Sequence, residues 1–226
     1  RGLGDVYKRQ VLYASGTITE GDGFDGIQSK TYVEAIRKIS QNDKIKALVL
    51  RVNSPGGSAN ASEEILYELM QLKTKMPIVV SFGDVAASGG YYIAQASDKI
   101  YAQPNTITGS IGVFGMIPNA QKLFNNFGLD FDEVKTNANA DQLKDVMTPM
   151  SATAKNTMQK SIVLIYGKFV NHVATNRKLT YEQVDKIGEG RVWSGTRAKQ
   201  IGLVDDFGSL DTAIKEAAKS VSYTHL

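Results

Sequence analysis

A serine surrounded by very small residues is the first candidate for chemistry in this chain. Ser88 stands in "VAASGGYYIA" (85 to 94), between two alanines and two glycines. One interpretation is structural, because serine is favoured just before a helix, where its side-chain oxygen accepts a backbone N–H. The other is chemical: a nucleophilic hydroxyl needs small neighbours such as Gly89 so that a substrate can approach, with free N–H groups at the helix start.

Two further stretches of small residues could line the same site. In "RVNSPGGSANASEE" (51 to 64) a strand ends in a Pro-Gly-Gly turn, followed by a capped helix. A tight connection explains Pro55 and one glycine, whereas Gly56 and Gly57 together could direct backbone N–H groups at an oxyanion, where one donor contributes about 3 kcal/mol. In "TITGSIGVFG" (106 to 115), Ser110 lies either in a substrate-lining loop or in a simple chain reversal.

The base that would activate Ser88 is not expected to be a histidine. The nucleophile elbow G-x-S-x-G requires glycine where this chain has Ala86. His172 falls in an expected helix, where it is interpreted as a surface or packing residue, and His225 falls in the C-terminal segment. The remaining base is a neutral lysine, and lowering its pKa from about 10.4 to about 7 costs about 4.6 kcal/mol, so that lysine must be buried.

Alternating strand and helix patterns predict the elements that would position these residues. The chain shows β-branched runs at 11–16, 45–52, 77–82 and 98–103, and amphipathic helical periods at 31–40 and 62–75. This alternation predicts right-handed βαβ units and a mostly parallel sheet, with functional loops beyond the carboxyl ends of its strands. A long helix follows around 151–178, and then strand, helix, strand, helix over 191–219, where Ser194 and Ser209 are expected to cap the helices. We expect one domain over residues 10–220.

The composition restricts the classes of function. With 226 residues, 42% hydrophobic and 22% charged, the chain has the composition of a soluble globular protein. The absence of cysteine excludes disulfides, thiolate zinc sites and a cysteine nucleophile. Residues 1–9 and 221–226 resemble translated adapter sequence, and without them the net charge falls from +3 to +1, which argues against a nucleic-acid partner.

Other ligand motifs are weak. "GDGFDG" (21 to 26) matches a dinucleotide pattern, but Asp22 and Asp25 would repel a pyrophosphate, so a solvated turn is the better interpretation. No histidine or carboxylate cluster has the spacing of metal ligands, and no apolar run reaches the ~18 residues that span a bilayer.

Four motifs, in order and spacing, carry a family resemblance. "LRVNSPGGS", "AASGGYYIA", "TGSIGVFG" and "RVWSGTRAKQIGLVD" lie between residues 10 and 219. On these residues the chain resembles the signal peptide peptidase A (protease IV) family, which are membrane-associated serine peptidases with a Ser/Lys dyad. The resemblance implies an α/β fold of the ClpP/crotonase type, with Ser88 as nucleophile, an oxyanion N–H from Gly57, and Gly56, Gly89 and Ser110 around the substrate.

The same resemblance implies partners and a location. The expected substrates are hydrophobic peptides, including cleaved signal peptides, hydrolysed through an acyl-enzyme without metal or cofactor. A homo-oligomer, a tetramer-like ring around an internal cavity, is implied as well. The expected location is the extracytoplasmic side of the bacterial inner membrane, reached through an anchor upstream of this chain.

One position departs from the family pattern. Where single-unit members have their lysine, this chain reads "TNANADQLKD" (136 to 145), with Asn139 or Ala140 at the lysine position and Lys144 several residues later. The chain therefore resembles the C-terminal, serine-bearing half of the tandem form, with the lysine supplied by an N-terminal half and Lys144 as the alternative base. Two other functions stay open: a crotonase-like enzyme that binds acyl-CoA, and a catalytically incomplete unit that shapes an oligomeric chamber.

Overall fold

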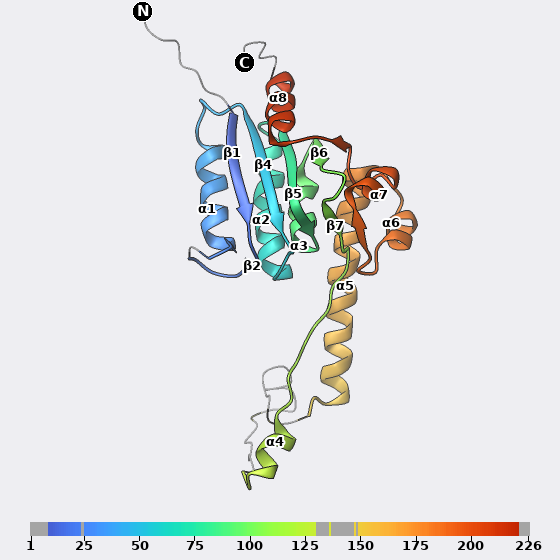
Figure 1. Cartoon of the computed structure of the whole chain (residues 1–226). Coiled ribbons are helices and arrows are strands. Elements are labelled where there is room, and N and C mark those ends of the chain that lie inside the picture. Colours follow the sequence, from blue (N-terminus) through green and yellow to red (C-terminus); the bar gives the residue numbers. More distant parts are fainter. Residues whose placement is uncertain (1–8, 24, 130–135, 137–146, 148, 222–226) are drawn as a thin grey trace, which may run out of the picture. The chain divides into compact units, whose positions relative to one another are not determined.

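The computed structural model describes residues 9–23, 25–129, 136, 147 and 149–221 (Figure 1). The strands, in chain order, are β1 (Arg9–Ser15), β2 (Ile18–Thr19), β3 (Ile27–Gln28), β4 (Ala47–Ser54), β5 (Ile78–Ala87), β6 (Lys99–Ala102), β7 (Ile107–Gly109), β8 (Val192–Ser194) and β9 (Asp206–Phe207). The helices are α1 (Ser29–Ser40), α2 (Ala59–Lys73), α3 (Gly89–Ile93), the 3₁₀ turn η1 (Ala94–Ala96), α4 (Gln121–Asn126), α5 (Ala152–Arg177), α6 (Tyr181–Ile187), α7 (Gly195–Gln200) and α8 (Leu210–Ser220).

A mostly parallel sheet forms the centre of the fold. Its strand order is β1-β4-β5-β6-β9, with β7 pairing to the later part of β5 and antiparallel to β8. Because β4 and β5 run parallel, the two loops that leave their carboxyl ends start at the same edge of the sheet. A separate two-stranded parallel sheet, β2 with β3, follows β1.

Helices cover the sheet on both faces, which explains the continuous apolar runs in its central strands. Consecutive residues Leu48 and Val49 of β4 are both fully buried although they point to opposite faces. On one face Val49 and Val79 pack against Ala213 and Ala217 of α8. Helix α2 lies behind β4 and β5 in Figure 1, on the other face, and α1 packs against α2.

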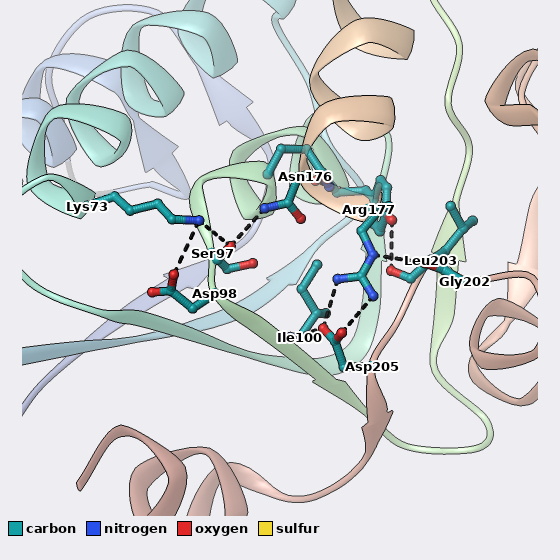
Figure 2. A network of polar contacts seen from close by, with 11 residues as sticks. Lys73, Ser97, Asp98, Ile100, Asn176, Arg177, Gly202, Leu203 and Asp205 are labelled. Carbon is teal, nitrogen blue, oxygen red and sulfur yellow. Dashed lines mark hydrogen bonds and ion pairs between the residues drawn. The ribbon is translucent and has the colours of Figure 1, made fainter. Parts of the chain in front are cut away.

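A polar network attaches the end of α5 to the sheet. The Arg177 guanidinium donates to both carboxylate oxygens of Asp205, at 2.8 and 2.9 Å, and its Nε donates to the carbonyl of Gly202 at 2.8 Å (Figure 2). The same Asp205 carboxylate accepts the backbone N–H of Ile100 in β6 at 2.7 Å. The Arg177 side chain is 8% exposed and that of Asp205 is 33% exposed, so the arginine is buried while the carboxylate still reaches water.

The described residues fall into two compact units. The first contains residues up to Gly112 and from Lys168 onward, and the second is Val113–Gly167. The first unit holds the sheet, and the second contains α4 and the beginning of α5. That residues 10–220 fold as one domain stays a prediction.

The observed elements confirm most of the predicted ones. The four predicted strands correspond to β1, β4, β5 and β6, the long helix is α5, and the oxygens of Ser194 and Ser209 accept N–H groups at the starts of α7 and α8. Strand β5 runs five residues past its predicted end because, beyond its pairing with β6, it gains β7 as a partner. In "GDGFDG", between β2 and β3, Gly21, Asp22, Asp25 and Gly26 are exposed, and Asp22 pairs with Lys30.

Candidate active site

Ser88 lies at the junction between β5 and α3 in a strained backbone conformation. Its φ is 52° and its ψ is −123°, a region that side-chain-bearing residues rarely occupy and that costs about 1–3 kcal/mol. The conformation is held by the backbone, because the Ser88 N–H donates to the carbonyl of Gly109 at 2.9 Å and the Ser88 carbonyl accepts from Tyr92 at 2.8 Å.

The Ser88 hydroxyl is not used for helix capping. Ser88 occupies the N-cap position of α3, but its side chain accepts no hydrogen bond from the helix, so the capping interpretation of this serine is wrong. Across the described part of the chain the hydroxyl has no hydrogen-bond partner, and the residue is half-buried. The hydroxyl is therefore available for chemistry.

The Pro-Gly-Gly turn after β4 lies directly against Ser88. A Cβ atom added to Gly56 would lie 2.8 Å from Ser88 Cβ and 2.6 Å from the backbone nitrogen of Gly89. Any side chain at residue 56 would collide with this junction, so the close approach requires glycine. Gly56 also has a φ of +99°, which other residues rarely adopt.

The two glycines of the turn have different hydrogen-bond roles. The N–H of Gly56 donates to Ser54 Oγ at 3.1 Å and is therefore occupied. The N–H of Gly57 donates to no acceptor among the residues that the structure describes, and the same is true of Gly89, the first residue of α3. Two unpaired backbone donors thus flank Ser88, one from each loop, and paired donors of this kind stabilise an oxyanion.

Ser110 follows the strand that borders β5 at this edge. Gly109 pairs with Ala87 in the parallel register, so Ser110 leaves β7 where Ser88 leaves β5. Like Ser88, it has a positive φ, 48°, and its N–H donates to the carbonyl of Arg191 at 2.8 Å. Residues 107–109 form a strand rather than the loop expected from the sequence.

His172 lies in a cluster next to α3. Its ring packs edge-on against Tyr92 with centroids 5.4 Å apart, and its Nε2 is 3.8 Å from the carboxylate of Glu63, which also accepts the Tyr92 hydroxyl. Burial lowers the pKa of His172 and raises that of Tyr92. The interpretation of His172 as a packing residue is confirmed.

The structure thus brings five of the predicted site residues to one edge of the sheet: Gly56, Gly57, Ser88, Gly89 and Ser110. Lys144, Asn139 and Ala140 lie outside the described residues. Sequence reasoning missed Ile18, whose backbone bridges to Gly57, because the contact joins segments far apart in the chain.

No helix in the described ranges has the length and apolar character that a bilayer span demands.

Comparisons with known proteins identify the family of this chain. A model of peptidase family S49 matches residues 70–224, and a Clp protease model matches residues 3–109. Protease 4 of Salmonella typhi is 43% identical over 211 residues, covering 92% of this chain and 34% of that protein. Protease 4 of Haemophilus influenzae is 39% identical over 217 residues, covering 95% and 35%, and the chloroplastic serine protease SPPA of Arabidopsis thaliana is 32% identical, covering 94% and 32%.

Among solved structures, a ClpP1 mutant from Listeria monocytogenes superposes with a TM-score of 0.59 over 88% of this chain and 91% of that one, at 16% identity. This likeness confirms the predicted α/β fold of the ClpP/crotonase type. The chain spans about a third of the length of the relatives described above. Because the S49 model matches more than half of it, the chain belongs to peptidase family S49.

Proposed function

We propose that this chain carries the serine nucleophile of a peptidase that hydrolyses hydrophobic peptides through an acyl-enzyme. The observation that carries the proposal is the Ser88 hydroxyl, which has no partner among the described residues and stands on a strained backbone beside the unpaired N–H groups of Gly57 and Gly89. Backbone strain of this kind is retained where the surrounding structure holds a reactive group in place.

The proposed reaction begins with attack of Ser88 Oγ on the peptide carbonyl carbon, while a base removes the hydroxyl proton. The carbonyl oxygen becomes an oxyanion that accepts hydrogen bonds from Gly57 and Gly89. The intermediate collapses by breaking the C–N bond, and the base returns its proton to the departing amine. Water then attacks the acyl-enzyme by the same route, which releases the acid and restores Ser88.

The proposed base is a neutral lysine, supplied either by an N-terminal half of the protein or by Lys144. Proton transfer contributes about 10²- to 10⁴-fold, so a chain without its base retains only positioning and oxyanion stabilisation. If the lysine comes from an N-terminal half, the isolated chain folds but barely cleaves peptides.

Three measurements test the proposal. The complete protein encoded by the gene should hydrolyse a hydrophobic fluorogenic peptide and react with a serine-directed phosphonate, and Ser88→Ala should abolish both reactions. Residues 10–220 alone should melt in one cooperative transition and show little hydrolysis. Strong hydrolysis by residues 10–220 that disappears in Lys144→Ala would instead assign the base to Lys144. Hydrolysis by Ser88→Ala equal to that of the wild type would overturn the proposal.

The alternative acyl-CoA function shares the paired N–H donors, which also suit a thioester carbonyl. Thioester chemistry of that kind needs no serine between the donors, so the strained Ser88 favours the peptidase. Retention of the protein on a CoA resin without phosphonate labelling would favour the alternative. A folded protein without either property would indicate a unit that only shapes a chamber.

We further propose assembly into a homo-oligomeric ring at the extracytoplasmic side of the bacterial inner membrane, with signal peptides among the substrates. Large exposed apolar side chains of the second unit support an interface between copies; they are Phe114, Met116, Ile117, Leu123, Phe127, Leu129, Val163 and Leu164. Monomeric proteins seldom expose so many apolar groups in one region. The molar mass of the complete protein, measured by light scattering, should be at least twice that of one complete chain, and the mass of a single chain would contradict the ring.

A further inference from the structure

Ile18 in β2 contacts both of the loops that supply the oxyanion donors. We propose that Ile18 is a positioning residue, which sets where the N–H groups of Gly57 and Gly89 point. The inference rests on the proposed function, because it concerns the same oxyanion site.

The backbone of Ile18 holds the Pro-Gly-Gly turn on both sides of Gly57. The Ile18 N–H donates to the carbonyl of Gly56, and the Ile18 carbonyl accepts from the N–H of Ser58, both at 2.8 Å. Gly57 fits so closely that an added Cβ would lie 2.0 Å from the Ile18 carbonyl oxygen. Because Ile18 bonds to the two neighbours of Gly57, the N–H of Gly57 stays unpaired while its position is defined.

The side chain of Ile18 reaches the second donor. It is fully buried, and its Cδ1 atom lies 3.2 Å from the point where a Cβ on Gly89 would stand. The terminal methyl of Ile18 therefore packs against the first residue of α3. One residue thus restrains the turn after β4 through its backbone and the start of α3 through its side chain.

The small sheet of β2 and β3 keeps Ile18 in place. The Ile27 N–H donates to the carbonyl of Thr17 at 2.9 Å, and Ile18 pairs with Ile27. Gly26, with a φ of +72°, allows this close approach, since a Cβ there would lie 2.5 Å from the Thr17 carbonyl oxygen. A substitution at Gly26 would therefore displace β2 without touching Gly57 or Gly89 directly.

These contacts predict how substitutions at Ile18 and Gly26 change the reaction rate. A misplacement of about 1 Å at a reacting group can cost about 100-fold. Ile18→Val removes only Cδ1 and should lower kcat about 3-fold, whereas Gly26→Ala should lower it about 10-fold or more. The KM should change less than about 2-fold in both, because the oxyanion forms only in the transition state.

Matched controls separate positioning from general loss of stability. Ile78→Val removes the same methyl from an equally buried isoleucine at the opposite end of β5 from Ser88. Gly21→Ala places a methyl at a glycine with a φ of +91° and no heavy atom within 4 Å. Both controls should keep wild-type kcat, even where their melting temperatures fall.

The test measures kcat, KM and the melting temperature of the complete protein and these four variants. Wild-type kcat in Ile18→Val and Gly26→Ala, with Ser88-dependent hydrolysis intact, would overturn the positioning role alone. A raised KM at unchanged kcat would also overturn it, because it would place Ile18 in substrate binding. Absence of Ser88-dependent hydrolysis in the wild type would overturn the proposed function, and with it this inference.

Discussion

Replacement of Gly57 by alanine tests the proposed oxyanion donor most directly. A Cβ at residue 57 would lie 2.0 Å from the carbonyl oxygen of Ile18 and 2.8 Å from the Ile18 nitrogen, whereas ordinary contacts begin at 3.4 Å. Both of these atoms belong to backbone that is hydrogen-bonded to residues 56 and 58. The collision can be relieved only if the turn moves by about 1 Å or more, and the Gly57 N–H moves with it.

The expected effect is that of losing one oxyanion donor. Removal of such a donor lowers kcat by about 10²- to 10³-fold, equivalent to about 2.7–4 kcal/mol of transition-state stabilisation. The KM should change little, because the ground-state carbonyl does not yet carry the charge that the donor stabilises. Overpacking should also lower the free energy of unfolding by about 1–3 kcal/mol.

The assay is steady-state hydrolysis of a hydrophobic peptide by the complete protein, with a thermal melt of each variant. Gly21→Ala is the matched control, because it also adds a methyl at a positive φ but meets no atom within 4 Å. A folded Gly57→Ala protein whose kcat lies within about 3-fold of the control would refute the assignment of Gly57.

Three further predictions concern stability. Ser88→Gly should relieve the backbone strain at φ 52°, whereas Ser88→Ala should keep that strain. The free energy of unfolding of Ser88→Gly should therefore be about 1 kcal/mol higher than that of Ser88→Ala, and equal denaturation midpoints would contradict stored strain. Arg177→Met should lower the free energy of unfolding by about 1–3 kcal/mol, because it removes the charged hydrogen bonds to Asp205, whose carboxylate is partly exposed and keeps its bond to the Ile100 N–H; an unchanged free energy in urea denaturation would contradict this. Burial lowers the pKa of His172 in the folded state, so the unfolded state binds the proton first and stability should decline as the pH falls through about 6.5. In His172→Gln the change in stability between about pH 7.5 and about pH 5.5 should be smaller; an unchanged difference would exclude His172 as its source.

Local patterns were sufficient to predict most of the larger elements and to single out Ser88 as a candidate nucleophile. Strand runs and helical periods are read from neighbouring residues, so β1, β4, β5, β6 and α5 could be predicted, with errors at their ends. The capping role of Ser194 is equally local, because its oxygen needs only an N–H three residues later. Ser88 was singled out by its small neighbours, and the family resemblance favoured the nucleophile over the cap; that its side chain accepts no hydrogen bond from the helix is visible only in the structure.

The sequence by itself determined the alternation of strands and helices and the supply of small residues at the strand ends, since these depend on near neighbours. Residue patterns left Gly56 and Gly57 equivalent, because they are identical in type and adjacent in sequence; the family resemblance implied Gly57, and only the tertiary structure shows why its N–H is free. Ser54 occupies the N–H of Gly56, and Ile18, from a distant segment, bonds on both sides of Gly57 and leaves its N–H open. The strained conformation of Ser88 likewise depends on Gly109 in a neighbouring strand. Hydrogen bonds between distant segments form only when the sheet assembles, so no local pattern could predict them.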